Sequence, residues 1–421
     1  MVSYEDLKSF MIKIFSNFQW EIEMEYLGQT FSVGKKESHW SNEPLIIKIK
    51  TSAAARTILN EDSLGFLIKV VDGEIDLLGN IYVLTFLRNH GNFNKIKSWR
   101  WAKRLIIDNR FQSMEKAKIN VKSHYDMPEQ AISQYLDSEY ESYSTGMWED
   151  PFNFNKEELI RIGKGKTDNF DSLEKAQWRK YKDGMDFIKP KNGDKIIDIG
   201  CGYGGQLVVA LEEYPNIKIV GWTHSHNQAV GGRKLLLKFP KENWELHEGD
   251  YREDKRYWSY DHVTSSGMVS HVGPSGLVPY LRNVRKLMKP EGGGKYVHHA
   301  IMASAVDIPI NWSPGTIFNK MYVWPGFHWF TPGQHHQALE LNGFKINKVI
   351  SLNDNYSKTT AAWYLRFKEN EAEIRKYMSD KEYRAWEIYL AGAVGCFKRK
   401  LNGGKYRFYC ESLPVNSKTW K

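Results

Sequence analysis

The chain has 421 residues, 41% hydrophobic and 26% charged, a composition typical of a folded globular protein rather than a disordered one. This length exceeds one ordinary core, so we expect one large domain and one smaller domain. The sequence contains no run of 18 apolar residues, so it predicts no membrane-spanning helix. Three scattered cysteines, Cys201, Cys396 and Cys410, predict neither a disulfide framework nor a metal site.

The amino-terminal third has the pattern of a separate mixed module. Residues Tyr4–Phe18 place their apolar side chains on one helical face. Residues Trp20–Tyr26 then alternate apolar and acidic side chains, as a half-buried strand does, and Leu45–Lys50 is a second candidate strand. We therefore expect a small α+β domain over residues 1–115 and a larger domain over residues 116–421.

The net charge of +9 concentrates in one stretch beside tryptophan. Lys95–Arg104 contains five basic residues and two tryptophans, and no acid lies between Asp76 and Asp108. Such a stretch is either a solvated helix face or a surface that binds an anionic membrane. We expect the membrane role, which makes residues 1–115 a lipid-associated domain, and no nucleic-acid partner. Charges within Met1–Phe15 do not fit a signal peptide, so a cytoplasmic, peripherally membrane-associated protein is expected.

From Asp194 onward, strands and helices alternate, which predicts a mostly parallel, doubly wound α/β sheet. The expected strands are Lys195–Ile199, Ile217–Trp222, Trp244–His247, His262–Ser266 and Gly294–Met302. The expected helices are Gly205–Tyr214, Ser225–Phe239, Leu277–Met288 and Gln334–Leu341. The fold class is therefore predicted to be Rossmann-like α/β.

A glycine-rich turn joins the first of these strands to the first helix. It spans Asp198–Gly205 and reads Asp-Ile-Gly-Cys-Gly-Tyr-Gly-Gly, so backbone amides can approach a nucleotide-like ligand. A dinucleotide site would need G-x-G-x-x-G and an acid about 20 residues later, whereas here the glycines run G-x-G-x-G-G and the next strand, which ends at Ile219–Gln228, carries no acid. No Gly-Lys-Ser/Thr follows, which excludes a P-loop. The pattern is typical of the S-adenosylmethionine (SAM) loop of Rossmann-like methyltransferases, with a ligand-free turn as the alternative.

Further strings, in the same order, resemble the cyclopropane-fatty-acid synthases and mycolic acid cyclopropane synthases. They are His124–Asp126, Leu136–Asp137, Tyr143–Ser144, Leu173–Gln177, Asp198–Gly205, Gly221–Gln228, Asp250–Arg252, His271–Gly273, Leu287–Gly293, Tyr356–Thr359 and Trp386–Leu390. The resemblance implies a class I SAM methyltransferase fold for residues 116–421, preceded by the smaller α+β domain.

The resemblance also implies which residues bind SAM. These are Tyr143, Ser144, Asp198, Gly200, Gly202, Gly204, Thr223, His224, Gln228, Asp250 and Tyr251. Tyr143 and Ser144 would contact the methionine end of SAM, and the backbone of the glycines would approach the same end. Thr223, His224 and Gln228 would contact the ribose, and Asp250 and Tyr251 would flank the adenine.

The family methylates a cis double bond of a phospholipid acyl chain and closes a ring by removing a proton from the added methyl group. The resemblance implies a bound bicarbonate ion as the base. In this chain His299, Ile301 and Tyr356 match the anion-binding positions of the family, whereas its Cys falls on Thr145 and its Glu on Ser270. Hydroxyl groups still donate hydrogen bonds to an anion, so bicarbonate remains a candidate cofactor.

We therefore expect a SAM-dependent C-methyltransferase acting on unsaturated phospholipid acyl chains. A cyclopropane product is favoured over a methylene- or methyl-branched chain. Two alternatives stay open: a small-molecule N-methyltransferase, and a membrane- or nucleic-acid-binding protein that retains an inactive methyltransferase fold. The intact loop at Gly200–Gly205 argues against inactivity, and the missing Glu at Ser270 argues against a cationic amine substrate. A homodimer is compatible with the sequence.

Overall fold

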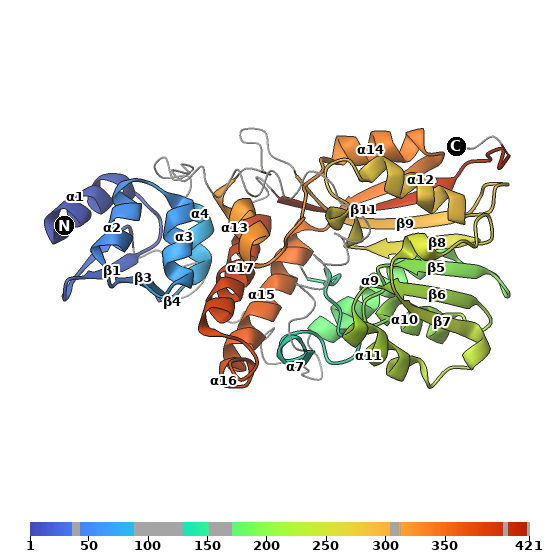
Figure 1. The fold of residues 1–421 in the computed structure, drawn as a ribbon, viewed down its shortest axis with the longest axis horizontal. Helices are drawn as coiled ribbons and strands as arrows, with labels where there is room; N and C mark the ends of the chain where they lie inside the picture. Colours follow the sequence, from blue (N-terminus) through green and yellow to red (C-terminus); the bar gives the residue numbers. More distant parts are fainter. Residues whose placement is uncertain are drawn as a thin grey trace.

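The computed structural model describes residues 1–35, 43–87, 129–150, 171–303, 311, 313–398 and 403–418. A small sheet lies at one end of the molecule and a larger sheet at the other, with helices between them (Figure 1). Three features of the sequence lie outside the described residues: the Lys95–Arg104 stretch, the His124–Asp126 string and the expected boundary after residue 115. Among the residues described, no helix has both the length and the apolar character to cross a bilayer.

The amino-terminal sheet has four strands in the order β2-β1-β3-β4. Their bounds are Gln29–Val33, Ile22–Tyr26, Leu45–Ile49 and Ile75–Gly79, and helices α1 (Tyr4–Phe15), α2 (Ser52–Leu59) and α3 (Ser63–Val71) pack with them. Strands β1 and β3 are parallel, and the two outer pairs are antiparallel. The side chains of β1 alternate between buried and half-buried positions, which confirms the predicted strand, although it begins at Ile22 rather than Trp20.

The larger sheet has seven strands in the order β10-β11-β9-β8-β5-β6-β7. Their bounds are β5 Lys195–Ile199, β6 Lys218–Thr223, β7 Trp244–Glu248, β8 His262–Ser266, β9 Lys295–Ala303, β10 Phe344–Ser351 and β11 Gly403–Ser412. The five predicted strands are confirmed as a parallel set. Strand β11 is antiparallel to both β9 and β10, and neither β10 nor β11 was predicted.

Helices cover both faces of this sheet (Figure 1). They are α9 Leu173–Ile188, α10 Gly205–Glu213 and α11 His226–Leu236 on one face, and α12 Leu277–Leu287 and α14 Pro332–Leu341 on the other. Successive strand residues serve opposite faces, so Ile196 packs in the first apolar layer and Ile197 in the second. The four predicted helices are confirmed within three residues at each end.

A layer of helices joins the two sheets. It contains α13 Pro314–Tyr322, α15 Asn353–Glu369 and α17 Asp380–Lys398, which share one apolar core with the amino-terminal helices and strands (Figure 1). The short elements are α4 Leu84–Leu87, α7 Glu129–Ile132, α16 Glu371–Ile374 and the 3-10 turns η1 Ile81–Val83, η2 Lys241–Asn243, η3 Tyr251–Glu253 and η4 Met268–His271. Because the core is continuous, the small sheet is packed firmly against the rest of the protein.

A buried ion pair ties α9 to α15. Arg366 Nη1 lies 3.0 Å from Glu174 Oε1, and the two side chains are only 10% and 5% exposed. Replacing Arg366 with Met leaves the carboxylate of Glu174 unpaired in a dry site, so we expect the free energy of unfolding to fall by about 3 kcal/mol. Urea unfolding measures this change. The double variant Arg366→Met/Glu174→Leu should recover most of the loss, and an unchanged midpoint for the single variant would contradict the expected role of the pair.

Candidate functional site: a cofactor cavity joined to an apolar cavity

The glycine-rich turn between β5 and α10 adopts a backbone conformation that favours glycine. Gly200, Gly202 and Gly204 have φ angles of 79°, 56° and 81°. The amide of Gly200 donates to the carbonyl of Trp222 at 3.0 Å, which ties the turn to the end of β6. A β-carbon added at Gly202 would meet no atom within 4 Å, so Gly202 borders open space. The turn therefore presents bare backbone to a cavity.

A cavity of about 570 Å³ lies beside this turn, a volume within the usual range for a cofactor site. Ten of the eleven residues expected to bind SAM line it, namely Tyr143, Ser144, Asp198, Gly200, Gly202, Thr223, His224, Gln228, Asp250 and Tyr251. Gly204 does not line it. Gly204 begins α10 in a left-handed conformation, and a β-carbon there would lie 3.4 Å from Leu246 of β7, so the structure places this residue in helix packing.

Polar side chains at the end of β6 occupy the place of the missing ribose acid. The Thr223 hydroxyl donates to Gln228 Oε1 at 2.7 Å. Ser225 begins α11 by accepting a hydrogen bond from the amide of Gln228. Because the Thr223 hydroxyl bonds to the carbonyl oxygen of the Gln228 side chain, the NH₂ group of Gln228 can still donate to a ligand hydroxyl.

Asp250 follows β7 and is held as an anion. Arg252 binds both carboxylate oxygens, with Nε–Oδ1 at 2.8 Å and Nη2–Oδ2 at 2.5 Å, and His224 Nε2 lies 3.5 Å from Oδ2. Burial favours the neutral acid, but the hydrogen bonds from His224 and Arg252 outweigh it and hold the pKa of Asp250 well below its ordinary value. Asp250 therefore presents a fixed negative charge next to buried Tyr251.

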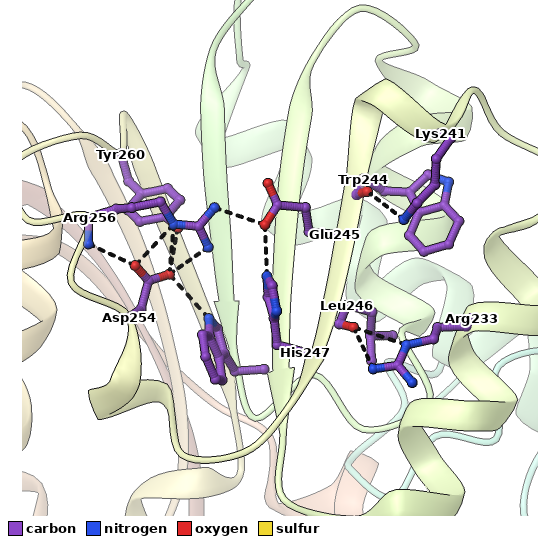
Figure 2. A network of polar contacts seen from close by, with 10 residues as sticks. Arg233, Lys241, Trp244, Glu245, Leu246, His247, Asp254, Arg256 and Tyr260 are labelled. Carbon is purple, nitrogen blue, oxygen red and sulfur yellow. Dashed lines mark hydrogen bonds and ion pairs between the residues drawn. The ribbon is translucent and has the colours of Figure 1, made fainter.

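A second carboxylate braces the wall of the cavity near β7. Asp254 accepts hydrogen bonds from Arg256 Nη2 at 2.8 Å, from the Tyr260 hydroxyl at 2.7 Å and from the indole N–H of Trp222 at 3.2 Å. Figure 2 shows this network continuing onto β7. Because Trp222 lines the cavity, the network fixes one of its aromatic walls.

Asp198 ends β5 and is 4% exposed. Its Oδ1 accepts a hydrogen bond from the Thr264 hydroxyl at 2.7 Å. Burial raises the pKa of Asp198 to about 7, against smaller opposing effects of Thr264 and the Lys180 ammonium. A cationic ligand in this cavity would therefore favour the ionised form of Asp198.

Helix α9 positions the segment that contains Tyr143 and Ser144. Lys180 Nζ donates to Ser144 Oγ at 2.7 Å, and Gln177 Nε2 donates to the Ser144 carbonyl at 2.8 Å. The Tyr143 ring stacks on Trp363 of α15, with centroids 5.0 Å apart and planes inclined by 3°. The segments Leu173–Gln177 and Tyr143–Ser144, which each resemble a family motif, are thus in contact with each other.

A second cavity, of about 330 Å³, is lined mainly by apolar side chains from both ends of the chain. Met11 and Phe66 contribute from the amino-terminal helices. Tyr143, Gly267 and His271 line both this cavity and the cofactor cavity. The two cavities therefore share a wall, and an apolar ligand in one lies next to a cofactor in the other.

The residues expected to be catalytic divide into two groups. Ser270, Ile301 and Tyr356 line the apolar cavity. Thr145 and His299 are 0% and 1% exposed and line neither of the two cavities described. Thr145 Oγ1, Ser270 Oγ and His299 Nε2 are buried without a hydrogen-bond partner, a condition that is rare in folded proteins and points to a ligand.

Two buried cations of β11 were missed at the sequence level. Antiparallel pairing places Lys405 opposite Ile301 and Arg407 opposite His299, so these four side chains leave the sheet on the same face. Lys405 and Arg407 are each 1% exposed. A charged residue at every second position favours a solvent-facing strand, and only the pairing of β11 with both β9 and β10 places these cations inside.

The family model for mycolic acid cyclopropane synthetase matches residues 112–403. The cyclopropane-fatty-acyl-phospholipid synthase of Escherichia coli (strain K12) is 27% identical over 368 residues, which cover 85% of each chain. The sphingolipid C9-methyltransferase of Candida albicans is 28% identical over 307 residues, which cover 71% of this chain and 56% of that relative.

Solved structures agree on the fold. The cyclopropane synthase MmaA2 from Mycobacterium tuberculosis superposes with a TM-score of 0.60 at 20% identity, covering 70% of this chain and 98% of that one. Coclaurine N-methyltransferase, bound to N-methylheliamine and SAH, superposes with a TM-score of 0.58 at 13% identity, covering 85% and 99%. These likenesses confirm the predicted class I SAM methyltransferase fold.

Proposed function

Since the chain belongs to the mycolic acid cyclopropane synthetase family and is a SAM-dependent methyltransferase, we propose that it methylates the double bond of unsaturated phospholipid acyl chains and closes the product to a cyclopropane. One observation carries the proposal: the apolar cavity and the cofactor cavity share Tyr143, Gly267 and His271. A methyl donor in one cavity and an alkene in the other would meet across this wall.

The contribution of the protein is orientation and shelter. Bound SAM would supply an electrophilic methyl group on a sulfonium. Tyr143, Trp324 and Tyr389 line the apolar cavity, and their electron-rich faces would stabilise the positive charge that methyl transfer leaves on the acyl chain. Burial lowers the pKa of His271 to about 4, so this residue adds no competing cation at neutral pH. The apolar lining would also keep water from trapping the carbocation.

Ring closure requires an acceptor for a proton of the added methyl group. Arg407 Nη2 lies 3.4 Å from His299 Nδ1, and because a guanidinium only donates, the His299 proton is assigned to Nε2. His299 Nε2 and the hydroxyls of Thr145 and Ser270 are thus three unpartnered donors. This set fits a small anion such as bicarbonate, which would supply a base at the site.

A second candidate is methylation of a small amine. The fold likeness to coclaurine N-methyltransferase, which covers 85% of this chain, favours it. The buried cations Lys405 and Arg407 oppose it, because they disfavour a positively charged amine beside them.

Expression in a bacterial host that lacks its own cyclopropane synthase tests the proposal. Mass spectrometry of the fatty acids should show products heavier by one CH₂ unit. These products should resist mild hydrogenation of double bonds, which separates a ring from a methylene branch. A host that expresses the Gly202→Val variant is the control. Unmodified acyl chains would refute the proposal. A gain of one CH₂ unit confined to another lipid class would show that this other lipid, rather than phospholipid, is the substrate.

We also propose that the protein docks on anionic membranes through Lys95–Arg104. Replacing the five basic residues of this stretch with Ala should lower recovery on vesicles of anionic phospholipid at least threefold, because each basic side chain contributes about 1 kcal/mol near such a surface. A control variant loses the same charge at exposed lysines elsewhere, namely Lys48, Lys238, Lys289, Lys376 and Lys381. Equal recovery of the two variants in a sedimentation assay would exclude this docking role.

A further inference from the structure

Lys405 of β11 is a buried charge that the proposed methyl transfer does not use. Its side chain is 1% exposed and lines the apolar cavity, with Nζ 5.0 Å from the centroid of the Tyr356 ring. Within the described part of the chain, no carboxylate and no hydrogen-bond acceptor engages this Nζ. A buried ammonium group without a counter-ion is strongly unfavourable, so its position calls for a partner.

The titratable side chains that face Lys405 from the neighbouring elements supply no negative charge. On the face of the sheet that Lys405 occupies, they are Arg407 on β11, His299 on β9, Lys180 on α9 and Tyr356 on α15, whereas His298 leaves the sheet on the other face. Asp62 is the acid among the described residues that line this cavity, and its carboxylate caps α3 by accepting a hydrogen bond from the Gly65 amide at 3.0 Å. Arg407 has its own carboxylate, Asp183, at 2.5 Å, and Lys180 donates to two side-chain oxygens. Of these three cations, Lys405 is the one whose side chain has no hydrogen-bond or ion-pair partner among the described residues, and its contact is with the Tyr356 ring.

Unpartnered hydrogen-bond donors belong to the same region. Ser270, whose Oγ has no hydrogen-bond partner, lines the cavity that Lys405 lines. His299 is buried beside it, two positions along β9 from Ile301, the residue that pairs with Lys405. A cation without an anion and donors without an acceptor are complementary parts of one anion site, because charge-assisted hydrogen bonds would satisfy all of them at once.

We propose that Lys405 forms the ion pair that holds a small oxyanion at this site, with Thr145, Ser270 and His299 as hydrogen-bond donors. The inference rests on the proposed function, since it supplies the counter-charge for the ring-closing base. The family pattern has Cys and Glu where this chain has Thr145 and Ser270. Loss of the Glu removes a repulsion toward an anion, and Lys405 adds an attraction from another strand.

The ion pair has a distinctive pH dependence. Burial and the nearby Arg407 lower the pKa of Lys405 to about 7 when no anion is bound. The anion binds the protonated amine, so above this pKa binding must take up a proton. The apparent affinity then falls about tenfold per pH unit. A neutral Lys405 amine that itself removed the methyl proton would give the opposite trend, with activity rising through pH 7.

Thermal unfolding of the full chain, without lipid or SAM, tests the ion pair directly. Sodium bicarbonate in a sealed cell is compared with sodium chloride at equal ionic strength, because a ligand of the native state raises Tm. The variants are Lys405→Met and Lys405→Arg. Lys320→Met is the matched control, since Lys320 is 9% exposed, lines neither cavity and has a pKa that burial lowers to about 8.

We expect bicarbonate to raise the Tm of the wild type and of Lys320→Met, to act partly on Lys405→Arg and to have no effect on Lys405→Met. Between pH 7 and pH 9 the wild-type dissociation constant should rise about 50-fold, because half of the Lys405 amine is already neutral at pH 7. Without bicarbonate, Lys405→Met should unfold at or above the wild-type temperature, because it removes an unpaired buried charge. A full bicarbonate shift in Lys405→Met overturns the proposal, as does stabilisation by inorganic phosphate with none by bicarbonate.

A product assay separates this inference from the proposed function. Lys405→Met should still transfer the methyl group of SAM to acyl chains, with the ring fraction of the product reduced at least tenfold and wild-type turnover dependent on bicarbonate. A turnover rate that is independent of bicarbonate and rises with pH would instead identify Lys405 as the base and refute the proposed ion pair between Lys405 and the anion. A wild type that transfers no methyl group to lipid would refute the proposed function, whereas the bicarbonate shift in Tm is read independently of lipid.

Discussion

Gly202→Val should raise the dissociation constant for SAM at least 100-fold, a loss of about 2.7 kcal/mol, in isothermal titration calorimetry. Gly202 lines the cofactor cavity with φ of 56°, and no atom lies within 4 Å of an added β-carbon. A valine side chain would therefore project into the space that the cofactor needs. A β-branched residue at positive φ would also strain the turn by about 1–3 kcal/mol.

The control for this variant is Gly193→Val. Gly193 has φ of 86°, also has no atom within 4 Å of an added β-carbon, and lies in the turn before β5, away from both cavities. The two variants carry similar backbone strain, so their free energies of unfolding should fall by similar amounts. Only Gly202→Val should lose affinity for SAM. Equal loss of SAM binding in both variants would mean that strain, rather than occlusion, is responsible.

Filling the apolar cavity should separate lipid turnover from cofactor binding. Gly392 lies within α17 and lines this cavity, and an added β-carbon there would meet only Thr85 Cγ2, at 4.0 Å. Gly392→Leu should lower methylation of acyl chains at least tenfold, because the side chain occupies the space of the substrate. SAM affinity should stay within twofold of wild type, since Gly392 does not line the cofactor cavity.

Stability should not explain that loss of activity. A glycine inside a helix costs about 0.5–1 kcal/mol relative to alanine, so leucine should leave the free energy of unfolding equal or higher. Gly333→Leu in α14 is the control, because Gly333 is an exposed helical glycine outside both cavities. Full lipid turnover in Gly392→Leu, measured with vesicle substrates, would show that the acyl chain does not occupy this cavity.

Local sequence patterns were sufficient for the parallel part of the large sheet and for the cofactor turn. Strands β5 and β8 have the bounds that the alternation of strands and helices predicted. Short buried strands followed directly by helices leave few alternatives, because the connection in a βαβ unit is local and right-handed. Positive φ angles at Gly200 and Gly202 follow from the same local chemistry. The residues that line the cofactor cavity lie mostly just after these strands, which is why motif order located them.

The apolar cavity and its cations could be recognised only in the tertiary structure. The walls of this cavity combine Met11 of α1 with residues of α13, α15 and α17, and no spacing along the chain predicts which helices meet. Lys405 and Arg407 alternate along β11 like residues of a solvent-facing strand. Their burial depends on β11 inserting between β9 and β10, a non-local pairing. Sequence thus sufficed for the fold class and the cofactor turn, because local contacts govern both, whereas long-range packing decided the shape and charge of the second cavity.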